Sequence, residues 1–195
     1  MSPVFSTMLH APDEELTPLT PQSIILWAGP KHSGKTTGAA RLVQAARAGG
    51  FVVAGCLAPS AYANDSLVGF DVVNLRSDER APLARRETGP GEGRRFRFIT
   101  EGLTLGNEAL DPIATRNADL IIVDEYGPLE LTFQGWRTAV DRLMTSTDAV
   151  LLLVVREELV DEVRQLYAAV PTRALVAAQQ RSIDEVLAVL GNNRR

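Results

Sequence analysis

The chain has 195 residues, of which 45% are hydrophobic and 23% are charged, a composition typical of one well-packed globular domain. Its formal net charge of −4 argues against nucleic acid as a partner. One cysteine, Cys56, excludes an internal disulfide, and the two histidines, His10 and His32, are too far apart in sequence to suggest a zinc site. No apolar run approaches the length of a membrane span and no secretory signal opens the chain, so we expect a cytoplasmic protein without a membrane partner.

The first segment of the chain differs from the rest in its prolines. Residues 1–22 contain four of them, which oppose both a regular helix and a central strand. We expect a proline-rich N-terminal arm over residues 1–22 and a single folded domain over residues 23–195. In that domain, helical patterns separate apolar runs that predict core strands at 24–28, 51–58, 120–123, 149–155 and 173–177. This alternation predicts an α/β fold with a mostly parallel sheet covered on both faces.

The segment from Gly29 to Thr36, Gly-Pro-Lys-His-Ser-Gly-Lys-Thr, matches the phosphate-loop pattern G-x-x-x-x-G-K-[ST]. It lies between the apolar run 24–28 and a helical pattern at 36–48, which is the strand, loop and helix context that this pattern requires. Glycine at positions 29 and 34 lets backbone N–H groups close around phosphate oxygens at a helix N-terminus. We therefore expect a nucleotide site here.

Individual roles within the loop follow from side-chain chemistry. Lys35 is expected to neutralise charge on the β- and γ-phosphates and so to take part in catalysis, and the Thr36 hydroxyl is expected to ligate Mg²⁺. Lys31 is more typical of an exposed surface lysine than of a phosphate ligand, and His32 occupies a variable position with no catalytic role. The expected nucleotide-binding residues are Gly29, Pro30, Lys31, His32, Ser33, Gly34, Lys35, Thr36 and Thr37.

Residues 61–100 interrupt the alternation of helix and strand. Residues 67–75 and 95–100 have strand patterns, and the segment between them is polar and rich in Gly, Pro and Arg. We expect a small antiparallel hairpin insert with a long mobile connection. Residues 76–97 hold seven arginines against four acidic residues. Either this is a solvated loop of mixed charge, or it is a lid that brings an arginine to the nucleotide or to a second anionic substrate.

The apolar run 120–123 ends in Asp124 and Glu125, which is the Walker B pattern of a buried strand that delivers acids to the ligand edge of a sheet. Asp124 is expected to hold Mg²⁺, and Glu125 to orient and deprotonate an attacking water. Alternatively, Glu125 caps or ion-pairs locally. Glu130 follows in the next loop, and its role is open.

Arg156 follows the apolar run 149–155, so it should lie at the same edge of the sheet as Lys35 and Asp124. It is expected either to contact γ-phosphate charge or to face solvent.

Three later patterns predict helices. Residues 103–117 carry a helical apolar face that Pro112 interrupts. Phe133 and Trp136 fall on one face of a second helix, a pattern more typical of core packing than of a stacking platform. Ser182 and Glu185 have the spacing of a capping box for a final helix.

With these motifs in view, the chain resembles the small P-loop nucleoside-triphosphatase family that includes the human cancer-related nucleoside-triphosphatase. The stretch D-E-x-G-P-L-E-L from Asp124 to Leu131 carries the resemblance most specifically. It implies a three-layer, RecA-like P-loop fold and Mg²⁺-dependent hydrolysis of the β–γ bond of ATP, GTP and other nucleoside triphosphates. By matching position, residues 29–36 would bind phosphate, Asp124 the magnesium and Glu125 the water.

Two other functions stay open beside a nucleoside-triphosphatase. The chain could be a small-molecule kinase whose arginine-rich insert binds the phosphate acceptor. It could also be a nucleotide-dependent accessory or switch protein that regulates an unidentified protein partner, similar to the adaptors of molybdenum-cofactor assembly. Glu125 beside Asp124 favours hydrolysis, because it supplies the base that water attack needs. The sequence has no Asn-Lys-x-Asp motif, so strict selectivity for GTP is not expected.

Overall fold

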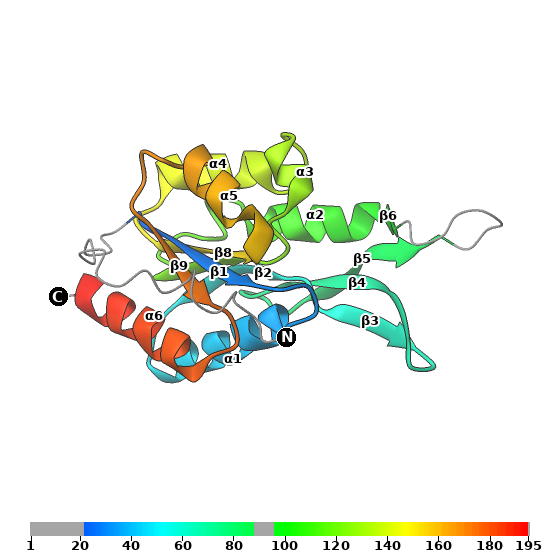
Figure 1. The fold of residues 1–195 in the computed structure, drawn as a ribbon, viewed down its shortest axis with the longest axis horizontal. Coiled ribbons are helices and arrows are strands. Elements are labelled where there is room, and N and C mark those ends of the chain that lie inside the picture. Colours follow the sequence, from blue (N-terminus) through cyan, green and yellow to red (C-terminus); the bar gives the residue numbers. More distant parts are fainter. Residues whose placement is uncertain (1–21, 88–95, 195) are drawn as a thin grey trace, which may run out of the picture.

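The computed structural model describes residues 22–87 and 96–194. These residues form a nine-stranded sheet with the strand order β6-β5-β4-β2-β7-β8-β1-β9, and β3 pairs with β4 beside this path. Helices cover both faces of the sheet, as Figure 1 shows. Residues 1–21, the bulk of the expected N-terminal arm, lie outside the described residues, so the division between arm and domain stays a prediction.

Five strands form the parallel part of the sheet and pair in the order β2-β7-β8-β1-β9. They are β1 (Ile24–Gly29), β2 (Val53–Leu57), β7 (Leu120–Val123), β8 (Val150–Arg156) and β9 (Thr172–Val176). These are the predicted core strands, shifted by at most a few residues. Every residue of β1, β2 and β7 is buried, because helices lie on both faces of a parallel sheet.

The two faces of the sheet have separate hydrophobic cores. Along β1, Ile24 and Leu26 belong to one core and Ile25 and Trp27 to the other, since alternate residues of a strand point to opposite faces. The core with Trp27 includes residues of α1 (Lys35–Ala48) and α6 (Gln180–Asn193). The opposite face carries α2 (Thr100–Ala109), α3 (Pro128–Leu131), α4 (Arg137–Ser146) and α5 (Val160–Leu166), the last preceded by the short helix η2 (Glu157–Leu159) (Figure 1). The three-layer α/β architecture is therefore confirmed.

The insert was predicted wrongly as a pair of strands that form a hairpin. It contains four described strands, β3 (Ser60–Ala63), β4 (Ser66–Asn74), β5 (Arg80–Arg86) and β6 (Phe96–Phe98), and we call these the antiparallel wing. Strand β4 pairs with β2, so the wing continues the central sheet. The two predicted strands are not partners, because β5 lies between β4 and β6.

Strand β5 occupies part of the segment that was predicted to be a long connection. Its apolar residues Ala81, Leu83 and Ala84 are buried, but arginines at both ends and Pro82 within it conceal the strand pattern in the sequence. Pro82 is tolerated because the pairing of β4 with β5 shifts register between Phe70 and Asp71, next to the Asp71–Pro82 pair. Residues 88–95, with Arg94 and Arg95, lie outside the described residues.

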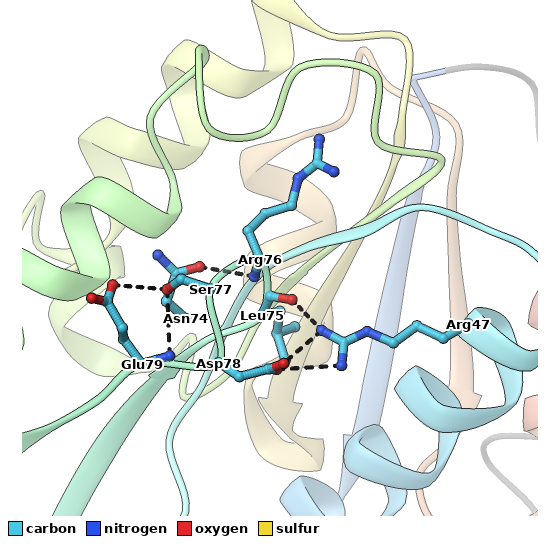
Figure 2. A network of polar contacts seen from close by, with 7 residues as sticks. All are labelled: Arg47, Asn74, Leu75, Arg76, Ser77, Asp78 and Glu79. Carbon is cyan, nitrogen blue, oxygen red and sulfur yellow. Dashed lines mark hydrogen bonds and ion pairs between the residues drawn. The ribbon is translucent and has the colours of Figure 1, made fainter.

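The turn between β4 and β5 is fastened to the helix that follows the phosphate loop (Figure 2). Arg47, in the last turn of α1, donates to the Leu75 carbonyl and pairs with the Asp78 carboxylate at 3.3 Å. Within the turn, Asn74 accepts from the backbone N–H of Arg76, and the Ser77 hydroxyl bonds the Glu79 carboxylate. The end of α1 and the start of the wing are thus joined.

Several arginines of the insert have partners within the protein. The Arg76 guanidinium donates to the carbonyls of Ala114 and Arg116. Arg80 and Arg85 both pair with Asp71, at 2.7 and 2.5 Å, and their charge lowers the pKa of that carboxyl against the effect of its burial. Arg80 and Arg85 are therefore held within the wing, Arg76 is held by the turns that follow α2, and a lid built from the remaining arginines stays a prediction.

Three helix predictions need correction. Helix α2 ends at Ala109, well before residue 117, and residues 110–117 form turns around Pro112. Phe133 precedes α4, with a left-handed φ of 60° and 74% of its surface exposed, whereas Trp136 is buried as expected.

The expected capping box is also absent, because α6 starts at Gln180 and Ser182 lies inside it. The Ser182 hydroxyl donates to the Val176 carbonyl. Across the described residues, no helix is long and apolar enough to cross a membrane.

Candidate active site

The phosphate loop connects the end of β1 to the start of α1. Gly29 is the last residue of β1, and Gly34 caps α1 with a left-handed φ of 82°, a conformation that glycine adopts without steric cost. Residues 30–34 are exposed. The first-turn N–H groups of α1 therefore open toward solvent at the carboxyl edge of the sheet, where an anion is favoured by the helix dipole.

Lys35 folds back over the loop that precedes it. Its ammonium donates to the carbonyls of Gly29 and Pro30, at 3.1 and 2.7 Å. Partial burial lowers the pKa of the ammonium, the charge of Glu125 opposes this shift, and the charge of Arg156 adds to it. Glu125 and Arg156 therefore both lie within electrostatic reach of Lys35.

Asp124 is fully buried at the end of β7, and its carboxylate oxygens are held in fixed positions. The backbone N–H of Ala58 donates to Oδ2 and that of Glu125 to Oδ1, both at 2.9 Å. The nearby Thr36 side chain also favours the charged form of this carboxyl. Burial raises the pKa of Asp124 to about 6, and these hydrogen bonds limit the rise.

The residues at this edge fit a magnesium ion. Thr36 and Asp124 bring a hydroxyl and a carboxylate near each other, and both are hard donors of the kind that Mg²⁺ prefers. Mg²⁺ binds proteins through one or two such groups while it keeps water and substrate phosphates as further ligands. In the described part of the chain, no group of three or more His, Cys, Asp and Glu residues could hold a metal ion.

Glu125 has an exposed side chain on an unusual backbone. Its φ is 63°, in the left-handed region, which costs a non-glycine residue about 1 kcal/mol. Among the described residues, its carboxylate has no hydrogen-bond or ion-pair partner, so the alternative of a local cap or ion pair is not realised. The carboxylate is free to accept a proton from water at the phosphate edge.

Glu130 lies inside the loop that follows Glu125 and is buried. Its Oε2 accepts from the backbone N–H of Gly127 at 2.7 Å, and its Oε1 from that of Trp136 at 2.9 Å. Both oxygens are therefore used to shape residues 127–136, and burial raises the pKa of the carboxyl. In this arrangement Glu130 anchors the loop and does not reach the phosphate edge.

Arg156 ends β8 and stands beside Gly29 in the pairing of β8 with β1. It is therefore at the same edge as the phosphate loop, as expected. Within the described residues its guanidinium has no hydrogen-bond or ion-pair partner. Both expected roles, contact with γ-phosphate charge and exposure to solvent, are compatible with this position.

Comparison with known proteins gives the family. The family model described as NTPase matches residues 24–186, which include the phosphate loop after β1 and the acidic pair Asp124 and Glu125 after β7.

The chain belongs to the NTPase family.

Two relatives each match about seven tenths of the chain. Nucleoside-triphosphatase THEP1 of Methanothermobacter thermautotrophicus is 35% identical over 147 residues, which cover 72% of this chain and 80% of that protein. Nucleoside-triphosphatase THEP1 of Hyperthermus butylicus is 34% identical over 142 residues, covering 71% and 74%. The solution structure of a human cancer-related nucleoside triphosphatase matches with a TM-score of 0.65 and 22% identity over 89% of this chain and 98% of that one, and so shares its fold.

One feature of this NTPase-family chain was missed by sequence reasoning. Tyr126, directly after Glu125, is buried, and its hydroxyl lies 2.6 Å from that of Tyr167. Tyr167 donates in turn to Asp141, which also accepts from Arg137. The sequence gives the position of Tyr126 beside the acidic pair, but it carries no signal that joins it to a tyrosine on a later helix.

Proposed function

We propose that the protein is a Mg²⁺-dependent nucleoside-triphosphatase that hydrolyses the β–γ bond of nucleoside triphosphates in the cytoplasm. The observation that carries this proposal is that two side chains suited to a metal ion and an exposed carboxylate meet at one edge of the sheet. Thr36 and Asp124 offer a metal position, and beside them Glu125 offers a carboxylate with no hydrogen-bond or ion-pair partner among the described residues. Family membership supports the same activity.

Binding begins with the phosphate loop. The backbone N–H groups at the start of α1 hydrogen-bond the phosphate oxygens, and Lys35 exchanges its two carbonyl acceptors, Gly29 and Pro30, for the β- and γ-phosphates. A magnesium ion held by Thr36 and Asp124 would neutralise charge on these phosphates. Lys35 then sits where negative charge develops on the bridging oxygen.

Hydrolysis requires a water in line with the bond that breaks. Glu125 orients this water and accepts its proton as the water oxygen bonds the γ-phosphorus. The bond from the γ-phosphorus to the bridging oxygen breaks, and the products are a nucleoside diphosphate and inorganic phosphate. Arg156 is placed to offset the charge on the equatorial oxygens.

Hydrolysis is favoured here over transfer to a small molecule. A kinase needs a second site for its acceptor, and Arg76, Arg80 and Arg85 of the wing are already bound to carbonyls or to Asp71. Nothing in the described residues singles out a partner-regulated switch.

The test is phosphate release by the purified protein with Mg²⁺ and, separately, ATP, GTP, CTP and UTP. We expect turnover of several of these nucleotides, and a loss of roughly a hundredfold or more in Glu125→Gln with binding retained. Glu158→Gln is the matched control, since Glu158 is an exposed acid whose charge also reaches Lys35. Tight binding without turnover would reject hydrolysis and favour a kinase or a switch.

A further inference from the structure

A series of hydrogen bonds leads away from Tyr126, the residue that follows Glu125. The Tyr126 backbone N–H donates to the Val154 carbonyl at 3.0 Å, which fixes this position against β8. Its ring is buried, with the hydroxyl 2.6 Å from the hydroxyl of Tyr167, just after α5. The backbone at Tyr126 is therefore held both by the sheet and, through its side chain, by the helical layer.

The direction of these hydrogen bonds can be assigned. Tyr167 donates its hydroxyl proton to Asp141 Oδ1 at 3.1 Å. A hydroxyl has one proton, so in the contact between the two tyrosines Tyr126 is the donor and Tyr167 the acceptor. Arg137 Nε donates to both oxygens of Asp141, at 2.9 and 2.8 Å. The hydrogen bonds thus lead from Tyr126 through Tyr167 to the ion pair of Arg137 and Asp141 on α4.

Buried polar groups such as these cost more free energy in a core than apolar side chains do. The Arg137 side chain is only 10% exposed, and its Nη1 is buried with no hydrogen-bond partner among the described residues. Its guanidinium lies between the rings of Phe133 and Tyr167, with 4.5 and 5.7 Å to the two centroids. The pair is buried on the Arg137 side only, since the Asp141 side chain is 41% exposed. Apolar residues of similar size often stabilise a core as well as a buried charge does, and a role in positioning would account for Arg137 here.

The residue whose backbone these contacts hold in place is Glu125. Its left-handed backbone is held on one side by the bond from its own N–H to Asp124, and on the other by the anchored Tyr126. Among the described residues its side chain has no hydrogen-bond or ion-pair partner, so its direction depends on this backbone. We propose that Tyr167 is a positioning residue for Glu125 that acts through the hydroxyl of Tyr126.

This inference rests on the proposed function, in which Glu125 is the base. Tyr167→Phe removes the acceptor of Tyr126 and should lower kcat about tenfold, the scale of one net hydrogen bond, while KM and nucleotide affinity stay within about twofold. Tyr126→Phe should act in the same direction. It leaves the contacts among Tyr167, Asp141 and Arg137 in place, so it serves as the second variant if Tyr167→Phe does not fold. Tyr62→Phe, at a tyrosine 65% exposed in the wing, is the control and should not change kcat.

The decisive experiment combines each tyrosine variant with Glu125→Gln and follows phosphate release with enzyme in excess over ATP. If Tyr167 acts through Glu125, Tyr167→Phe slows the wild type about tenfold but leaves the residual rate of Glu125→Gln unchanged. A general structural defect that reduces the active fraction would slow both backgrounds by the same factor, and that result would overturn the inference. So would an unchanged kcat in Tyr167→Phe and Tyr126→Phe.

Failure of the proposed function has a different signature. If Glu125→Gln alone turns over as fast as the wild type, Glu125 is not the base, and the proposed function and this inference are both wrong. If Glu125→Gln is slow and the tyrosine effect is equal in both backgrounds, only the inference is wrong.

Discussion

The Thr36 hydroxyl, in α1, lies close enough to the buried carboxylate of Asp124, at the end of β7, to oppose the rise in the pKa of that carboxyl. This proximity joins two motifs that are 88 positions apart by their numbers (124 − 36). Removal of either oxygen should therefore affect magnesium more than it affects the fold.

Asp124→Asn should abolish magnesium-dependent turnover while nucleotide binding without the metal persists. Asparagine has a similar shape but no negative charge, so it is a poor Mg²⁺ ligand. We expect phosphate release to fall by roughly a hundredfold or more. The check is turnover with Mg²⁺, together with titration calorimetry of ATP in EDTA. Equal loss of affinity with and without metal would contradict a metal role for Asp124.

The stability of the metal-free protein should depend on pH through the same carboxyl. Its folded pKa of about 6 is above the ordinary value of 3.8, so the stability it contributes is complete below pH 3.8 and is lost as pH rises through 6. The free energy of unfolding of wild type minus that of Asp124→Asn should therefore fall by about 3 kcal/mol between pH 3 and pH 8. Urea denaturation of both proteins measures this difference. A difference that stays constant with pH would show that Asp124 titrates normally.

Glu125 and Glu130 should respond differently to replacement by glutamine, one by losing activity and the other by losing stability. Glu130→Gln places an amide N–H against the N–H of Gly127 or Trp136, and should cost about 1–3 kcal/mol of unfolding free energy. Glu125→Gln removes an exposed carboxylate and should leave stability nearly unchanged while activity is lost. Denaturation and phosphate release on both variants test the pair. A stable, inactive Glu130→Gln would instead give Glu130 a catalytic role.

Glycines at two helical positions also make a matched pair. A Cβ at Gly38 would lie 2.7 Å from Ala178 Cα and 2.8 Å from its nitrogen, whereas a Cβ at Gly191 would meet nothing within 4 Å. Gly38→Ala should therefore destabilise the protein, because the chain after β9 must move away from α1. Gly191→Ala should stabilise it by up to about 1 kcal/mol, the helix preference of alanine over glycine. Thermal denaturation checks both signs, and a stabilising Gly38→Ala would show that the packing of α1 against Ala178 is loose.

Features that depend on neighbouring residues could be predicted from the sequence, whereas features that depend on residues far apart in the sequence could not. The phosphate loop, Asp124 and Glu125 could be predicted because each is defined by neighbours in sequence and by an adjoining apolar strand. Strand β5 could not, because the arginines at its ends and Pro82 hide the alternation of its buried residues. The Tyr126–Tyr167 contact depends on how α5 packs on the sheet, which no local pattern encodes. Phe133 was misplaced because its left-handed φ turns the chain just before α4 begins.

The central claim is that water, activated by Glu125, attacks the γ-phosphorus. The most direct measurement is ATP hydrolysis in ¹⁸O-labelled water with Mg²⁺, by wild type and Glu125→Gln, with the label located by mass spectrometry. Attack at the γ-phosphorus puts one ¹⁸O atom in the inorganic phosphate and none in the ADP, at a rate that falls roughly a hundredfold or more in the variant. Label in the ADP, or equal rates for the two proteins, would contradict the account.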